Sequence, residues 1–161
     1  MIMTKEERMI QKDRMRFIKN KLSANLAILA ILFDVFYFVS IYQSDVGDYY
    51  YSILIGGSIL YNLVFMLAAF LASEGSKNYK GGYAWLLGAL GIGQIVRIFI
   101  LPAQAHAAEL KKIGQVMGDK QYFFVVGCLI ASAACLLVSA AVGYVRSRTL
   151  KNYVASLEKT A

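Results

Sequence analysis

The sequence predicts an all-α integral membrane protein, an antiparallel bundle of four transmembrane helices with both termini in the cytoplasm. Hydrophobic residues make up 58% of the chain, whereas soluble domains are typically about 45–50% apolar. These residues gather in four stretches of about 19 to 24 residues, the length that a helix needs to cross about 30 Å of hydrocarbon. Open sheet edges find no hydrogen-bond partner in lipid, so each stretch is predicted to be a helix. We expect the 161 residues to form one membrane domain.

The four spans are expected to follow a basic segment at the start of the chain. They cover residues 22–42, 51–72, 83–101 and 122–145. Residues 1–21 combine apolar side chains spaced by seven (Met3, Ile10 and Phe17) with a stripe of Arg and Lys. This amphipathic pattern is typical of a helix that lies on anionic lipid headgroups. Residues 146–161 are expected to be a basic cytoplasmic tail.

The distribution of basic residues predicts the orientation of the chain. Thirteen Lys and Arg residues fall in the N-terminal segment, the second loop and the tail. The first loop has none, and the third loop has Lys111, Lys112 and Lys120. Because loops rich in Lys and Arg stay in the cytoplasm, both termini and the second loop are predicted to be inside. The sequence therefore indicates a multi-pass protein of a plasma membrane, most simply a bacterial one.

The third loop contains the chain's one proline and its one histidine. Residues 103–112 are rich in Ala, Glu, Leu and Lys, which favour a short helix. Pro102 fits either the first turn of that helix or a kink at the end of the third span. His106 and Glu109 are three residues apart and can share a helix face, but zinc requires further ligands. We predict no metal site and no cofactor here.

Four polar residues are expected inside the membrane. Asp34 lies in the first span and Arg97 in the third, and a charge at that depth normally finds a partner within the protein. Both spans run outward, and the two positions differ in depth by about 6 Å, which an arginine side chain can cover. Asn62 and Gln94 are placed to complete a polar cluster. This cluster is either a structural ion pair or a working substrate or proton site.

The fourth span carries a small residue at every fourth position. These residues are Gly127, Ala131, Cys135, Ser139 and Gly143. Small residues at this spacing let two helix backbones approach closely in lipid. The sequence leaves open whether this helix-packing stripe lies inside the bundle or against another chain. Leu129 and Leu137 are expected on the opposite face.

These observations favour a protein that does no chemistry. Cys128 and Cys135 are seven residues apart, about 10 Å along a helix, which is too far for a disulfide. Nucleic-acid binding is not expected, because the sequence lacks a basic face with interleaved aromatic residues. The leading hypothesis is a non-enzymatic subunit or accessory protein of a membrane complex, which packs through small-residue faces against another membrane protein or itself. The alternative is a small oligomeric transporter or channel that uses Asp34 and Arg97.

Overall fold

The computed structural model describes residues 18–42, 52–110 and 117–158, which form four long α-helices. The helices are α2 (Lys21–Ile41), α4 (Ser52–Lys77), α5 (Gly81–Leu110) and α6 (Asp119–Glu158). Each contains a window that is long and apolar enough to cross a membrane. The prediction of an all-helical chain with four potential spans is therefore confirmed.

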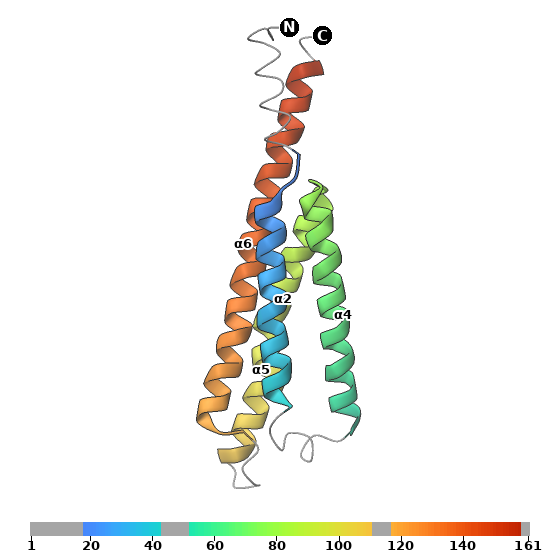
Figure 1. The fold of residues 1–161 in the computed structure, drawn as a ribbon. Helices are drawn as coiled ribbons and strands as arrows, with labels where there is room; N and C mark the ends of the chain where they lie inside the picture. The colour runs from blue at the N-terminus through green and yellow to red at the C-terminus, as the bar shows by residue number, and fades with distance from the viewer. Residues whose placement is uncertain (1–17, 43–51, 111–116, 159–161) are drawn as a thin grey trace, which may run out of the picture.

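The four helices lie side by side, and each runs in the opposite direction to the one before it (Figure 1). Contacts join α2 to α4 and α6, and join α5 to α4 and α6. Figure 1 also shows α4 leaning away from its neighbours toward the end at which α2 stops. At the opposite end, α6 continues beyond the other three helices.

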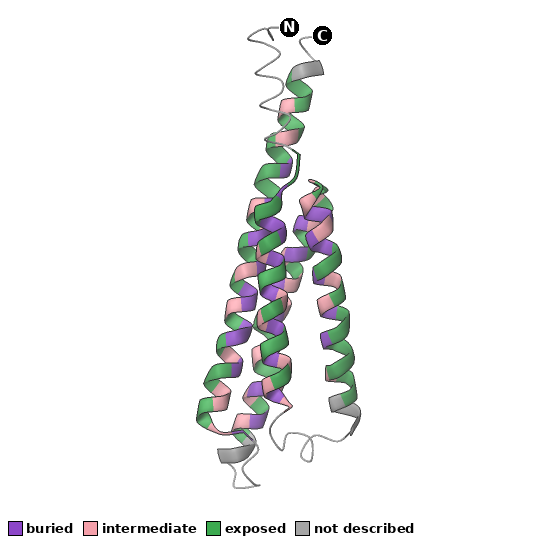
Figure 2. Ribbon diagram, in the orientation of Figure 1, coloured by how far each residue is buried: buried purple, intermediate pink, exposed green. Residues whose placement is uncertain are grey.

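Small side chains fill much of the interior, whereas many of the large apolar side chains point outward. Buried alanines on α2 and α4, among them Ala27, Ala30 and Ala69, pack around Leu87 and Leu136. Figure 2 shows the buried positions as bands that face the neighbouring helices, with exposed positions on the outer faces. The exposed side chains include many Leu, Ile, Val and Phe. This distribution suits a surrounding lipid solvent, in which helices associate through close backbone approach.

The end of the third span differs from the prediction. Pro102 lies inside α5, which continues to Leu110, so residues 103–110 extend the span and are not a separate helix. Proline lacks an N–H group and removes one helical hydrogen bond. The alanine-rich residues that follow favour helix strongly, and extending an existing helix needs no new nucleus. Lys111 and Lys112 lie outside the described residues.

The fourth helix extends well beyond the predicted span. It has 40 residues, which corresponds to about 60 Å at 1.5 Å per residue, twice the thickness of the hydrocarbon core. Most of the predicted tail is therefore helical, as far as Glu158. Residues 146–158 contain no Gly or Pro that would end the helix. The amphipathic pattern predicted within residues 1–21 falls mainly on residues 1–17, which lie outside the described part of the chain.

A short turn joins α4 to α5. The backbone N–H groups of Asn78 and Lys80 donate to the carbonyl oxygen of Gly75, at 3.2 and 3.1 Å. Tyr79 has a φ of 58°, in the left-handed region that residues other than glycine rarely adopt. The Ser147 hydroxyl donates to the Tyr79 carbonyl oxygen at 2.9 Å, so α6 holds this turn in place.

Candidate functional site in the membrane interior

The structure places Asp34 of α2 and Arg97 of α5 in direct contact. Arg97 Nη1 donates to Asp34 Oδ1 at 2.9 Å, and both side chains are buried. The two residues are 63 positions apart in the chain. Bringing two such charges out of water is costly, so a buried pair needs good geometry and further hydrogen bonds to be stable.

The other two predicted polar residues lie against this pair. Gln94 Nε2 donates to Asp34 Oδ1 at 2.9 Å, one turn before Arg97 on the same helix. Arg97 Nη2 donates to Asn62 Oδ1 on α4, and Asn62 Nδ2 donates to the Ser58 carbonyl oxygen at 3.0 Å. The structure thus brings together all four of the predicted intramembrane residues, from α2, α4 and α5.

The fourth helix joins the cluster through a serine. Ser132 of α6 is buried, and its Oγ accepts from Gln94 Nε2 at 3.4 Å. The same hydroxyl donates to the Ala30 carbonyl oxygen of α2 at 3.0 Å. Hydrogen bonds therefore connect all four helices at this level of the membrane.

Two tyrosines that the sequence analysis did not assign to the site hold the guanidinium of Arg97. Its Cζ atom lies 4.1 Å from the ring centroid of Tyr37 and 5.0 Å from that of Tyr61. Contact with an aromatic face stabilises a guanidinium, more so where water is excluded. A signal was present in the sequence, because Tyr37 follows Asp34 by one helical turn and Tyr61 precedes Asn62 directly. We name the seven residues the polar cluster: Asp34, Tyr37, Tyr61, Asn62, Gln94, Arg97 and Ser132.

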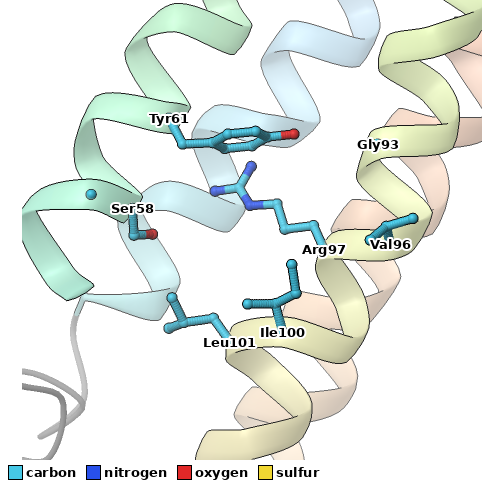
Figure 3. A pocket seen from close by; sticks show the side chains of 8 residues that line it. Ser58, Tyr61, Gly93, Val96, Arg97, Ile100 and Leu101 are labelled. Atoms are coloured by element: carbon cyan, nitrogen blue, oxygen red, sulfur yellow. The ribbon is translucent and has the colours of Figure 1, made fainter.

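A groove between α4 and α5 runs beside the polar cluster. Its volume is about 440 Å³, and its lining is almost entirely apolar. Figure 3 shows Arg97 reaching from α5 across this space toward the ring of Tyr61, with Ile100 and Leu101 on the same side of the groove as the base of Arg97. Glycines line both walls, Gly57 on α4 and Gly93 on α5. Arg97 is thus the charged residue among those that line this apolar groove.

One oxygen of the buried carboxylate is left without a hydrogen bond. Asp34 Oδ2 has no donor within the part of the chain that the structure describes, although Asp34 Oδ1 accepts two hydrogen bonds. The hydroxyl of Tyr37 is in the same situation among the described residues. Buried polar atoms normally find partners, so these two atoms are where the polar cluster has capacity for a further donor or acceptor.

A second group of buried hydroxyls lies near the α4–α5 turn, and the sequence analysis missed it. Ser23 Oγ of α2 lies 2.6 Å from Ser76 Oγ of α4 and 3.0 Å from Ser139 Oγ of α6. Ser139 Oγ lies 2.7 Å from the Ser23 carbonyl oxygen, to which it donates. We call these three residues the serine cluster. Isolated serines in apolar helices are common, so only the packing of three helices identifies these as a group.

The small-residue stripe of the fourth helix does not lie on one face. Ser139 and Gly143 are buried, Ala131 and Cys135 are half-buried, and Gly127 is exposed with open space around its Cβ position. Each step of four residues turns the helix by about 40° beyond a full turn, so the stripe rotates from open to packed surface. Of the two residues expected on the opposite face, Leu129 is buried. Leu137 is exposed.

His106 lies at the other end of the described helices. Its ring stacks on Tyr122 with centroids 4.4 Å apart, and its Nε2 lies 3.8 Å from Asp119 Oδ1. No group of three or more potential metal ligands occurs among the described residues.

Comparisons of this chain with protein-family models, with curated proteins and with solved structures found no match.

Proposed function

We propose that the protein is a non-enzymatic membrane subunit that receives a transmembrane helix of a partner protein in the groove between α4 and α5. One observation carries this proposal. The hydrogen bonds of the polar cluster join the four helices to one another, while the apolar groove beside it lies open between two helices. Both terminal nitrogens of Arg97, Nη1 and Nη2, donate hydrogen bonds to other side chains of this chain, which fits a structural role.

The walls of the groove suit a helix. Gly57 has open space around its Cβ position and Gly93 meets only the Tyr61 hydroxyl, at 3.4 Å. Glycine on both walls lets another backbone approach closely, which is how helices associate where lipid removes the hydrophobic driving force. The groove lies toward the end of the molecule at which α4 leans away from its neighbours (Figure 1).

Photocrosslinking from the groove tests this proposal. A photoreactive amino acid replaces Ile100, which lines the groove, or Ile130 on α6, which does not. The two positions are matched, since Ile100 is 51% exposed and Ile130 is 55% exposed. We expect a discrete adduct with one membrane protein from position 100 and none from position 130, as seen by mass spectrometry of the native membrane.

A filled groove provides the control. Gly57→Leu places a side chain in the space and should abolish the adduct from position 100, because the partner helix can no longer approach. Equal adducts from both positions, or an adduct that survives Gly57→Leu, would contradict the proposal. An adduct with a second copy of this chain would replace the partner protein with self-association at the same groove.

The second candidate is a small transporter or channel. It is favoured by Asp34 Oδ2, which has no donor among the residues that the structure describes. A buried carboxylate whose second oxygen has no donor among the described residues is a place at which a proton can be held, and the neighbouring Arg97 is a place for an anion. Such a function requires water to reach the polar cluster from at least one side of the membrane. The two functions therefore differ in the accessibility of this cluster.

Cysteine labelling tests both water access and the proposed orientation, N-in and C-in in a plasma membrane. In a background with Cys128→Ala and Cys135→Ala, we expect an impermeant thiol reagent added to intact cells to label Lys120→Cys. Asn78→Cys, in the α4–α5 turn, should stay protected; both positions are exposed in the structure. The opposite pattern would reverse the topology.

The same series includes Ser132→Cys, a nearly isosteric change inside the polar cluster. We expect this thiol to resist a small water-soluble methanethiosulfonate in open membranes as well as in intact cells. Labelling of Ser132→Cys at a rate near that of Lys120→Cys would favour the transporter over the accessory subunit.

A further inference from the structure

A second cavity lies at the end of the molecule where the α4–α5 turn is found, far from the groove already described. Its volume is about 360 Å³, and α5 and α6 form its walls. The lining residues include Gly81, Gly82 and Trp85 of α5 and Tyr144, Arg148 and Lys151 of α6. Trp85 and Arg97 are 12 residues apart on α5, which separates this cavity from the polar cluster by about 18 Å.

The cavity is cationic. Arg148 and Lys151 are three residues apart on α6, so both side chains project from the same face of the helix. Both are exposed, and neither forms an ion pair with any acidic side chain that the structure describes. Among the described residues, the two charges are thus available to an added anion.

An apolar cavity of about 330 Å³ adjoins the cationic one along the same two helices. The residues that line it are Ala84, Trp85, Gly88, Ala140, Ala141 and Tyr144. Trp85 and Tyr144 line both cavities, and their rings meet edge to face with centroids 5.9 Å apart. Gly88, Ala140 and Ala141 have small or no side chains, which leaves an open channel beside the helices. The cationic space therefore continues into an apolar one at the pair of aromatic rings.

We infer that this paired cavity binds one anionic phospholipid molecule. Arg148 and Lys151 hold the phosphate and headgroup, and an acyl chain lies along Gly88 and Ala141. The order of residues along the paired cavity, from cations through aromatic rings to apolar side chains, fits an amphiphile. Tryptophan and tyrosine prefer the headgroup level of a membrane, between the charged groups and the hydrocarbon. A small soluble anion would use only the cationic half, and an apolar ligand only the other. This site is independent of the partner groove and extends the proposed function.

The chain's single tryptophan makes this inference measurable, since Trp85 lies between the two halves of the site. The full-length protein is reconstituted into phosphatidylcholine vesicles that contain a fixed fraction of acyl-brominated phosphatidylglycerol or acyl-brominated phosphatidylcholine. Bromine quenches tryptophan fluorescence on contact. We expect brominated phosphatidylglycerol to quench Trp85 at a severalfold lower fraction than its zwitterionic counterpart. Arg148→Gln and Lys151→Gln should each remove most of that preference, because each takes away one of the two cations that attract the anionic headgroup.

A matched control removes two charges from the same end of the molecule but outside the site. Lys19→Gln with Lys21→Gln, on exposed positions at the start of α2, should leave the preference unchanged. Loss of preference to the same extent in this control would mean diffuse surface attraction and would overturn the specific site. Equal quenching by both lipids in the unmodified protein would also overturn it.

Two further measurements separate the halves of the site. Ala141→Leu fills the apolar half from an exposed position, and it should lower quenching by brominated phosphatidylglycerol while the cations remain. Inorganic phosphate added to the same vesicles should not displace the brominated lipid. Displacement by phosphate would show a soluble-anion site. Undiminished quenching in Ala141→Leu would mean that no acyl chain lies in the apolar half. Either result would contradict the lipid assignment.

Discussion

Neutralising one member of the Asp34–Arg97 pair should destabilise the protein strongly, and neutralising both should restore it. Asp34→Asn leaves a buried guanidinium without its counter-charge. Arg97→Gln leaves a buried carboxylate whose remaining hydrogen bond, among the described residues, comes from Gln94. Breaking a buried pair in this way typically costs about 3–5 kcal/mol. Combining the two changes removes both charges, so most of the loss should be recovered. Thermal unfolding in detergent and the amount of folded protein in the membrane report the effect.

A partly exposed ion pair of nearly the same length is the control. Lys77 Nζ and Glu74 Oε1 are 2.8 Å apart, but both side chains are partly exposed. Glu74→Gln should therefore cost only about 0.2–1 kcal/mol, the range of surface pairs. A double variant of Asp34 and Arg97 that is no more stable than the worse single variant would mean that the two charges are not coupled.

The rescued double variant also separates the two candidate functions. If the pair joins the helices, the crosslink from position 100 should return together with the fold, because the α4–α5 groove is re-formed. If the pair is a working site, the refolded protein should still bind no proton or anion there. The polar cluster thus contributes to function either by stabilising the fold alone or through its charges. The double variant separates these two contributions because its stability is expected to be close to that of the unmodified protein.

Much of the fold was predictable because the membrane restricts the chain to few structures. A window of about 20 apolar residues can only be a helix in lipid, so the four helices follow from composition. Their ends were less predictable, since helix continuation past Pro102 and into residues 146–158 depends on local propensity and not on the thickness of the bilayer. The orientation prediction rests on the basic residues and remains a prediction.

The polar cluster was foreseen in part for a similar reason. Asp34, Arg97, Asn62 and Gln94 stand out because lipid offers a charge or an amide no partner, which makes their mutual contact the simplest arrangement. Tyr37 and Tyr61 were missed because tyrosine is common in apolar helices, and placing it in lipid does not carry the free-energy cost of a charge or an amide. The serine cluster was missed because a serine hydroxyl can satisfy itself on its own helix, so its interhelical role appears only in the packing.

Within the small-residue stripe, the expected effect of substitution differs between its two ends. A Cβ atom at Gly143 would lie 2.7 Å from Ser76 Oγ and 3.1 Å from Ser23 Oγ, so even alanine forces the serine cluster to shift. Gly143→Leu cannot be accommodated without separating α6 from α2 and α4. We expect a loss of about 3 kcal/mol or more, at the upper end for overpacked interiors. Thermal unfolding in detergent measures it.

Gly127→Leu is the matched control, because the same change occurs on the same helix at a position with open space. Within the single chain it should alter stability by no more than about 0.5 kcal/mol, as surface substitutions do. If Gly127→Leu unfolds the purified protein as readily as Gly143→Leu, the packed end of the stripe has no special role. If it leaves the purified chain intact but abolishes an assembly in the membrane, Gly127 is the point at which another chain approaches. The rotation of the stripe therefore predicts that one sequence pattern serves internal packing at Gly143 and leaves Gly127 free for contact outside the chain.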